Sequence, residues 1–318
     1  MSSGHWPLRT AHCPLLKLQC LAMILSPATV IPDLNLIPLP FICVIVGVFG
    51  AIIGSFLNVV IHRLPRGESI VFPNSRCPSC ETPIAFYDNV PVLSYVLLGG
   101  RCRSCKLHIS ARYPAVEALT GLLWAAVVWR DGLSFALQFD LVFVTAIIAL
   151  IFIDAEHMIL PNAITYPGIL FAVIARLAIP WLTATLHFDD LPMLLNGALT
   201  GMPVWAASLI GAVIGALVGG GSLWLMGWAW QRLRGVEAMG LGDVKMMFMV
   251  GAYLGWRLTI LTIFFGALSG SVIGIMLTLR AGRRDLQSLL PYGVYLGIGS
   301  IVALFFGSRI VNWYLGFY

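Results

Sequence analysis

Long apolar runs separated by short polar segments recur along this chain of 318 residues. Most runs extend for about 18 residues or more, the length that an α-helix needs to cross the hydrocarbon core of a bilayer. They are too long and too uniformly apolar for the alternating strands of a membrane barrel. Because a backbone in lipid must satisfy its own hydrogen bonds, the pattern indicates a bundle of membrane helices.

The pattern predicts an all-α, polytopic membrane helix bundle with about eight transmembrane helices. The predicted spans are 39–61, 113–130, 135–153, 162–181, 201–229, 241–255, 257–279 and 292–316. The fifth span is long and the sixth is short. The division between the sixth and the seventh depends only on the short segment Gly255-Trp256-Arg257.

Composition agrees with this class of protein. The chain is 59% hydrophobic and only 10% charged, whereas a soluble domain carries roughly 25% charged residues. The N-terminal residues 1–22 mix apolar and polar types and include Pro7 and Pro14, so they do not form a clean signal peptide. We interpret 1–22 as a non-native extension or a misassigned start, with a more uniformly apolar stretch beginning at Met23.

Positive charge indicates how the bundle is oriented. Three alternate loops, 62–112, 230–240 and 280–290, contain 12 of the 19 Lys and Arg residues. The stretch 182–200 has no positive charge and carries Asp189 and Asp190. Since cytoplasmic loops of membrane proteins are enriched in Lys and Arg, we expect the three rich loops in the cytoplasm and both termini outside. This topology accounts for the net charge of +5, so no nucleic-acid partner is implied.

The domain organisation follows from the spans and loops. The predicted parts are 1–38, an N-terminal extension that is partly non-native or disordered; 39–61, the first transmembrane helix; 62–112, a cytoplasmic loop domain; and 113–318, the remaining transmembrane bundle.

Two Cys-x-x-Cys pairs lie in the 62–112 loop, Cys77 with Cys80 and Cys102 with Cys105. Their spacing is typical of a four-thiolate zinc site, which is structural because no ligand position remains open for water. Disulfides and redox chemistry are the alternatives. Cytoplasmic thiols stay reduced, and a redox motif needs only one pair, so we favour zinc. A loop of this size has little core of its own, and a metal would stabilise it.

Two aspartates lie at the ends of apolar runs. Asp154 ends the stretch Leu141–Ile153, and Asp243 lies in Gly240-Leu241-Gly242-Asp243 before the stretch Val244–Leu254. An ionisable residue beside the hydrocarbon core is costly unless it is paired or functional. The predicted topology places both carboxylates at the cytoplasmic ends of their helices, and glycines allow close backbone approach. A pair of carboxylates that share a proton is the machinery of acid proteolysis.

Each aspartate also has an ordinary interpretation. Asp243 is a favourable residue in the first turn of a helix, and Asp154 can be an interfacial carboxylate. Among the neighbours, Asp140 belongs to the outer end of its helix and Glu156 is a fallback for the dyad. Lys245 is more typical of a cation that extends toward the interface. In a dyad, one acid polarises the carbonyl and the other activates water, and neither role is assigned to one residue.

Several motifs resemble the bacterial type IV prepilin peptidases, the Gly-x-Gly-Asp aspartyl proteases that serve type IV pilus and type II secretion systems. The resemblance covers about residues 40–316 in order. The matching motifs are Gly54–Pro65, the two cysteine pairs, Asp88–Tyr95, Ile109–Pro114 with Glu117, Asp154-Ala155-Glu156, Leu160-Pro161-Asn162, Gly240–Lys245 and Pro291-Tyr292-Gly293.

The resemblance implies a bifunctional enzyme of the bacterial inner membrane. Such enzymes use two aspartates, which fall on Asp154 and Asp243, to cleave the basic leaders of prepilins or pseudopilins after a glycine at the cytoplasmic face. They then methylate the new N-terminal residue, usually phenylalanine, with S-adenosylmethionine. The cysteine loop belongs to versions with both activities. No Gly-rich fingerprint for the methyl donor is evident, and Gly67 and Glu68 are the candidates, with a polar turn as the alternative.

Two other classes of function remain open at this stage. A transporter could use Asp154 and Asp243 as proton or cation ligands, although such sites usually lie near the midplane of the membrane. A zinc-loop scaffold without activity would leave the aspartates unexplained. Membrane lipid is a partner of the chain under every interpretation.

Overall fold

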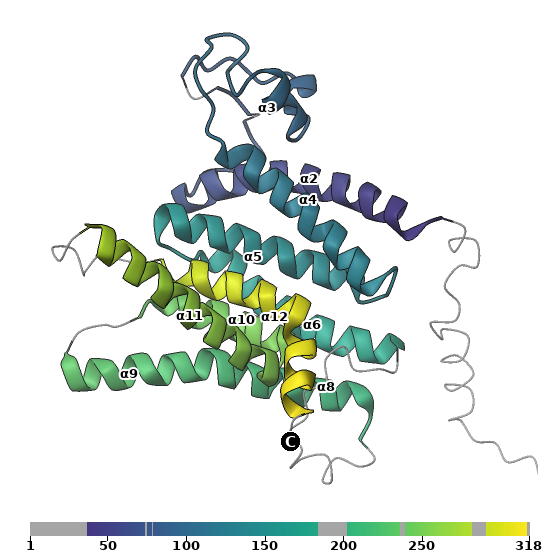
Figure 1. Ribbon diagram of the computed structural model, residues 1–318, viewed down its shortest axis with the longest axis vertical. Coiled ribbons are helices and arrows are strands. Elements are labelled where there is room, and N and C mark those ends of the chain that lie inside the picture. The colour runs from purple at the N-terminus through teal and green to yellow at the C-terminus, as the bar shows by residue number, and fades with distance from the viewer. Residues whose placement is uncertain are drawn as a thin grey trace, which may run out of the picture.

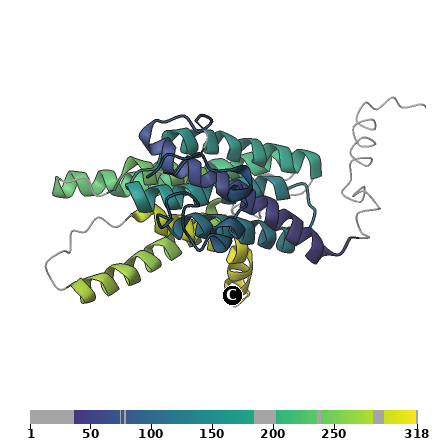
Figure 2. The ribbon, with the colours of Figure 1, turned by 90° about the horizontal axis from the view of Figure 1, so that it is seen from above.

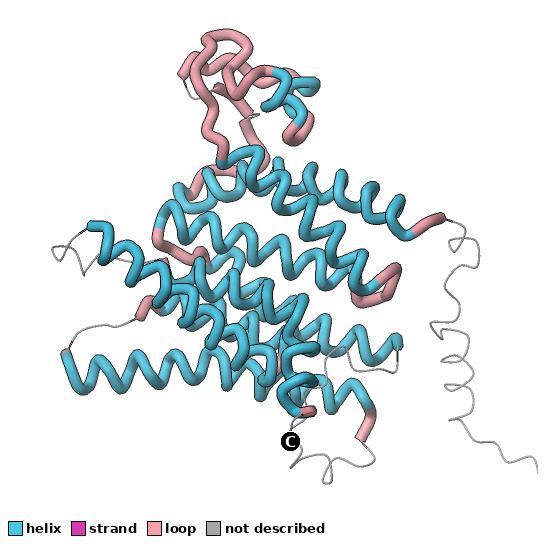
Figure 3. The backbone as a smooth tube through the Cα atoms, in the orientation of Figure 1, coloured by secondary structure: helices cyan, strands magenta, loops and turns pink. Residues whose placement is uncertain are grey.

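The computed structural model describes residues 37–73, 75–77, 79–183, 202–235, 239–281 and 291–316 (Figure 1). Within those ranges the backbone forms helices, turns and loops, and strand pairing is limited to two isolated bridges (Figure 3). The all-α prediction is therefore confirmed for the described residues. The predicted N-terminal extension, apart from its last two residues, lies outside them.

Each predicted span has a counterpart among the observed helices. The elements are α2 (Leu39–Arg63), η3 (Leu64–Arg66), η4 (Phe86–Asn89), α3 (Leu93–Leu97), α4 (Arg112–Asp131), α5 (Leu137–His157), α6 (Asn162–Thr183), α8 (Val204–Ala216), η5 (Leu217–Gly221), α9 (Ser222–Arg234), α10 (Leu241–Leu254), α11 (Trp256–Ala281) and α12 (Tyr292–Leu315). The long fifth span corresponds to α8, the π-helical η5 and α9 in succession. Gly255, with φ of +80°, separates α10 from α11 where the sequence predicted a division.

Six helical segments in the described part of the chain are long and apolar enough to cross a membrane. The two predicted spans not among them are α4 and α10. Helix α10 has 14 residues, about 21 Å of helix, which is shorter than the hydrocarbon core. Helix α4 carries Glu117 and charged residues at both ends. The chain is thus a multi-pass membrane protein whose number of spanning helices is near eight.

Helix α10 is short because it lies inside the protein instead of facing lipid. Met246, Met247 and Val250 are fully buried along it. It packs on α6, α8 and η5, and its contact with α8 is close. A Cβ added at Gly251 would lie 2.1 Å from the carbonyl oxygen of Gly215, so both positions need glycine for this approach. By contrast, α2 exposes large apolar side chains such as Phe41, Phe49 and Ile52, as expected of a helix that contacts lipid.

The cysteine loop, residues 64–111, joins the end of α2 to the start of α4 and contains η4 and α3. It forms a separate lobe at the top of Figure 1, and Figure 2 views the bundle from above that lobe. Glu117 of α4 accepts a hydrogen bond of 2.7 Å from the backbone N–H of Val92 and so fastens the loop to the bundle. We call the end of the bundle where the loop attaches the loop end, and the opposite end the far end.

Candidate active site and metal centre

Three helices bring two carboxylates to one point at the loop end. Asp154 lies in the last turn of α5, Asp243 in the first turn of α10, and Gly293 in the first turn of α12. A Cβ added at Gly293 would lie 2.8 Å from Oδ2 of Asp154 and 3.1 Å from Oδ1 of Asp243. Both carboxylate oxygens therefore approach the same face of Gly293. The distance between the two oxygens cannot exceed the sum of these two distances. Asp154 is only 5% exposed, so this meeting point is largely enclosed by protein.

The start of α12 orients Asp154. The backbone N–H of Val294 donates a hydrogen bond of 3.1 Å to Asp154 Oδ2, across 140 positions of sequence. The first N–H groups of a helix have no partner within the helix, and the residue before α12, Pro291, supplies no side-chain cap. The Val294 N–H, which also donates to the carbonyl oxygen of Pro291 at 3.2 Å, thus fixes the direction of the Asp154 carboxylate.

Sequence reasoning did not assign a role to Gly293. The segment Pro291-Tyr292-Gly293 entered only as part of the family resemblance. A proline immediately before an apolar run is a signal for a helix start, and a glycine at the second helical position leaves room beside it. Those signals identify the start of α12, but its position against α5 and α10 depends on tertiary packing.

The two glycines before Asp243 behave differently from each other. A Cβ at Gly242 would lie 3.0 Å from Cβ of Leu160, so this residue permits the close packing that we expected. A Cβ at Gly240 would meet nothing nearer than 3.6 Å, and its φ of −70° is open to any residue. The expectation of close approach thus holds at Gly242 and is wrong at Gly240, which serves as the N-cap residue of α10.

The three polar residues that the sequence offered beside the dyad, Glu156, Lys245 and Asp140, are engaged elsewhere. Glu156 accepts a hydrogen bond from Arg112 at the start of α4. Lys245 donates to Asn162 Oδ1 at 2.9 Å and lies 5.2 Å from the centre of the Tyr166 ring, as a helix-end cation rather than a partner of the dyad. Asp140 lies in the first turn of α5, at the far end, as the sequence predicted.

The two cysteine pairs form two hairpin turns with the same backbone pattern. In the first, the N–H of Cys77 donates to Thr82 and the N–H of Glu81 donates back to Cys77. In the second, Cys102 donates to Leu107 and Lys106 donates back to Cys102. Glu81 and Lys106, each next to the second cysteine of its pair, both have positive φ, +53° and +61°. Each pair is thus a knuckle that presents two sulfurs on one side.

The four sulfurs of Cys77, Cys80, Cys102 and Cys105 fit a tetrahedral metal ion. All four lie within 4.8 Å of one another. Across the two knuckles, Cys77 Sγ is 3.7 Å from Cys105 Sγ, and Cys80 Sγ is 3.9 Å from Cys102 Sγ. Zinc–sulfur bonds of about 2.3 Å in a tetrahedron place the sulfurs about 3.8 Å apart. The spacing therefore suits a metal such as zinc and is too long for a disulfide between the knuckles.

Each knuckle favours the thiolate form at one of its two cysteines. Hydrogen bonds with the hydroxyl group of Thr82, 3.3 Å from Cys80 Sγ, and with its backbone lower the pKa of the Cys80 thiol to about 6. Backbone hydrogen bonds from Cys105 and Ser104 likewise lower the pKa of the Cys102 thiol. Because a metal ligand must be deprotonated, each knuckle supplies one sulfur that is prepared to bind.

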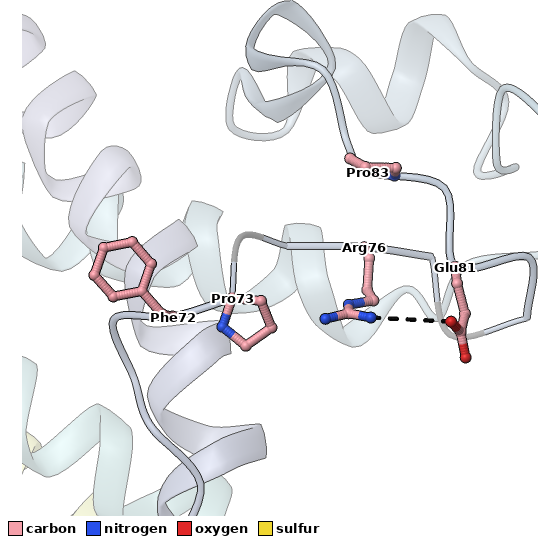
Figure 4. A pocket seen from close by; sticks show the side chains of 5 residues that line it. All are labelled: Phe72, Pro73, Arg76, Glu81 and Pro83. Carbon is pink, nitrogen blue, oxygen red and sulfur yellow. Dashed lines mark ion pairs between the residues drawn. The ribbon is translucent and has the colours of Figure 1, made fainter.

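A pocket of about 460 Å³ lies beside the first knuckle (Figure 4). It is lined by Phe72, Pro73, Arg76, Glu81 and Pro83. Arg76 and Glu81 face each other across it at 3.9 Å, as the dashed line in Figure 4 marks. Gly67 and Glu68, the residues suggested for the methyl donor, are not among the lining residues. Gly67 ends η3 with φ of +68°, and the suggestion remains a prediction.

Two family models and a set of relatives match the chain. Residues 48–131 match the bacterial peptidase A24 N-terminal domain, and residues 141–275 match the type IV leader peptidase family. A prepilin leader peptidase/N-methyltransferase of Pseudomonas aeruginosa is 34% identical over 88% of this chain and 95% of its own length. Proteins of the same name from Aeromonas hydrophila and Myxococcus xanthus are 36% and 39% identical, over 85% and 77% of this chain and 93% and 65% of their own lengths. No solved structure matches.

Proposed function

The chain belongs to the type IV leader peptidase family, and we propose that it cleaves prepilins or pseudopilins after a glycine and then methylates the new N-terminus. It is a peptidase with methyltransferase activity, as its family and relatives are. Asp154 and Asp243 are the proposed catalytic residues. The main support for this proposal is that both carboxylates lie next to Gly293. Two residues 89 positions apart in the sequence therefore form one candidate dyad.

Hydrolysis by this dyad needs one protonated and one ionised carboxyl group. The protonated group donates a hydrogen bond to the oxygen of the scissile carbonyl, while the carboxylate takes a proton from water. The water oxygen attacks the carbonyl carbon, the C–N bond breaks, and a proton passes to the leaving amine. The hydrogen bond from the N–H of Val294 keeps the Asp154 carboxyl group oriented during these steps. Since two close carboxylates titrate as a unit, the dyad is not divided into an acid and a base.

The position of the dyad suits a substrate that is itself partly in the membrane. A prepilin has a basic leader followed by an apolar helix, so its scissile bond lies at the interface. Asp154 and Asp243 lie in terminal turns of their helices, at the depth where an interface would be. We place the loop end in the cytoplasm of a bacterial inner membrane, because the loops at that end carry most of the Lys and Arg residues.

We propose that the cysteine loop holds a structural zinc ion. Cys77, Cys80, Cys102 and Cys105 would supply all four ligands, which leaves no position for catalysis at the metal. The metal would fix the two knuckles relative to each other and so stabilise a loop with few buried side chains. In the described part of the loop, Cys77, Ser94 and Gly100 are the buried residues.

The second activity requires S-adenosylmethionine, whose sulfonium group supplies an activated methyl group when bound. The new N-terminal residue, usually phenylalanine, would present its amino group as the acceptor. Gly67 and Glu68 are our candidates for contact with the donor; both lie in the turn that follows α2. This turn is continuous with the lobe that carries the cysteine knuckles. The turn and the knuckles of the 62–112 segment would therefore both serve methyl transfer.

A transporter is the alternative function, and two observations argue against it. The carboxylates lie at one end of the bundle, whereas transporter sites usually lie near the midplane. The family and the relatives are peptidases.

The test is cleavage of a prepilin-like peptide, with a basic leader, a glycine and an apolar segment, by the purified protein in detergent. We expect Asp154→Asn and Asp243→Asn each to abolish cleavage while the protein stays folded in the membrane. Asp88→Asn is the matched control, because Asp88 pairs with Arg103 in the loop and takes no part in the dyad. Full cleavage by either dyad variant refutes the proposal.

A further inference from the structure

A second buried polar contact links the two helices that carry the dyad. Asp140 of α5 accepts a hydrogen bond of 2.7 Å from the hydroxyl group of Tyr253 of α10. Asp140 is fully buried and Tyr253 is 1% exposed. On α5 this contact lies 14 residues before Asp154, and on α10 it lies ten residues after Asp243. Carboxylates thus lie near both ends of this helix pair: Asp154 and Asp243 approach Gly293 at the loop end, and Asp140 binds Tyr253 at the far end.

Arg130 extends this contact to two further helices. Its guanidinium group donates to Asp140 Oδ2 at 3.0 Å, to both oxygens of Asp131, and to the carbonyl oxygen of Leu304 in α12. Each carboxylate oxygen of Asp140 therefore has a donor. A buried carboxylate is stable only when it is paired in this way, since removal from water is otherwise costly. We call Arg130, Asp140 and Tyr253 together the polar clamp.

The end of α10 is held on its other side as well. Arg176 of α6, which is 1% exposed, donates to the carbonyl oxygen of Ala252 at 3.2 Å. The ring of Tyr253 stacks on Phe143 of α5, with 4.3 Å between centroids and 12° between planes. The last turn of a helix has free carbonyl groups that favour a cation, so Arg176 suits this position.

The clamp matters because α5 and α10 are not close neighbours along their lengths. Helix α5 packs mainly on α12 and α4, whereas α10 packs mainly on α6, α8 and η5. The relative position of Asp154 and Asp243 therefore depends on few direct contacts between their helices. A helix advances by about 1.5 Å per residue, so a shift of α10 by one residue would move Asp243 by about that distance. A misplacement of a catalytic group by about 1 Å can already lower the rate about 100-fold.

We infer that the polar clamp is a positioning device that sets the separation of Asp154 and Asp243 from the opposite end of their helices. This inference rests on the proposed dyad. Tyr253 and Asp140 act through helix position and touch neither the substrate nor the reacting atoms. The clamp also gives a role to the fully buried carboxylate of Asp140, which lies at the far end, away from the site of chemistry.

The test compares Tyr253→Phe, which keeps the stacked ring and removes the hydroxyl group, with Asp140→Asn and the double variant. Cleavage is measured per folded molecule, with kcat and KM determined separately. We expect kcat to fall about tenfold or more with KM unchanged, because the clamp is remote from the loop end. The double variant should be no worse than Asp140→Asn alone, because that substitution already weakens the contacts of residue 140 with both Tyr253 and Arg130. Tyr295→Phe is the matched control, since its buried ring packs on Gly270 of α11, away from the clamp.

Three results would overturn the inference. They are an unchanged kcat in Tyr253→Phe, a loss confined to the amount of folded protein, and a change in KM alone. Asp154→Asn is measured beside these variants to separate the two proposals. Cleavage by Asp154→Asn would refute the proposed dyad. Wild-type kcat in Tyr253→Phe together with an inactive Asp154→Asn would refute only the role of the polar clamp.

Discussion

Gly293 shows how a residue without a side chain can determine a site built from two carboxylates. Its Cα lies where Asp154 and Asp243 approach each other, and the N–H of its neighbour Val294 binds one of them. The added Cβ distances of 2.8 and 3.1 Å are below or near the limit of real contacts. A side chain here must displace at least one carboxylate.

We therefore predict that Gly293→Ala lowers the rate of cleavage by about 100-fold, the usual effect of moving a catalytic group by about 1 Å. The measurement is kcat for a prepilin-like peptide, with folding checked by thermal unfolding in detergent. Gly227→Ala in α9 is the control, because a Cβ there meets only Met239 at 3.9 Å. Activity of Gly293→Ala equal to that of the control would show that the carboxylates do not meet at this glycine.

Glu156 is two residues from Asp154 on the same helix, yet it belongs to a different contact. Residues two apart on a helix face different directions, and Glu156 binds Arg112. The Glu156 side chain is 35% exposed, and ion pairs with this exposure contribute up to about 1 kcal/mol. We predict that Glu156→Gln keeps cleavage within about fivefold of the wild type, a factor that corresponds to this energy. An inactive Glu156→Gln beside an active Asp154→Asn would reverse the assignment.

At the scale of elements, the cysteine loop was predictable because its signal is local. The spacing of the cysteines within each pair identified the two knuckles, although the positive φ at Glu81 and Lys106 has no sequence signal. The start of α12 was not predictable in the same way. Its contact with Asp154 crosses 140 positions, and no periodic pattern in either helix encodes it.

Removal of one cysteine should release the metal, because three thiolates hold an ion far less well than four. We predict that Cys77→Ser and Cys102→Ser each lower the zinc content of the purified protein from about one ion per chain to near zero. Cys43→Ser is the control, since Cys43 is a buried residue of α2 outside the cluster. The measurement is the zinc content per chain of the three variants by elemental analysis. About one zinc ion per chain in Cys77→Ser would contradict a four-cysteine site.

Of the eight spans predicted across the whole molecule, six correspond to described helices that are long and apolar enough to cross a membrane. Apolar runs thus predicted the order of the helices but not the exact number that span. They could not distinguish helices that face lipid from those enclosed by protein, because the side chains of both are apolar. Helix α10 is the example: its methionines and valines are as apolar as those of a spanning helix, but most of its 14 residues are buried, and it packs on α6, α8 and η5. The buried pairing of Asp140 with Tyr253 was also missed, because it joins residues 113 positions apart.

The orientation of the bundle is a prediction at this scale. Arg232 and Arg234 close α9, and the loop that contains them belongs to the set rich in positive charge. A reporter enzyme that is active only outside the cytoplasm should therefore be inactive when fused after Gly235 and active when fused after Tyr318. The opposite pattern would place the loop end, and the dyad with it, on the outer face.

We propose that Asp154 and Asp243 together cleave a prepilin whose new N-terminus the same chain then methylates. The decisive measurement is mass spectrometry of a prepilin-like peptide after incubation with the purified protein and S-adenosylmethionine. We expect a product that begins immediately after the glycine and carries the mass of one added methyl group, and no product with Asp243→Asn. An intact peptide after incubation with the wild type, or the same product from Asp243→Asn, would contradict it.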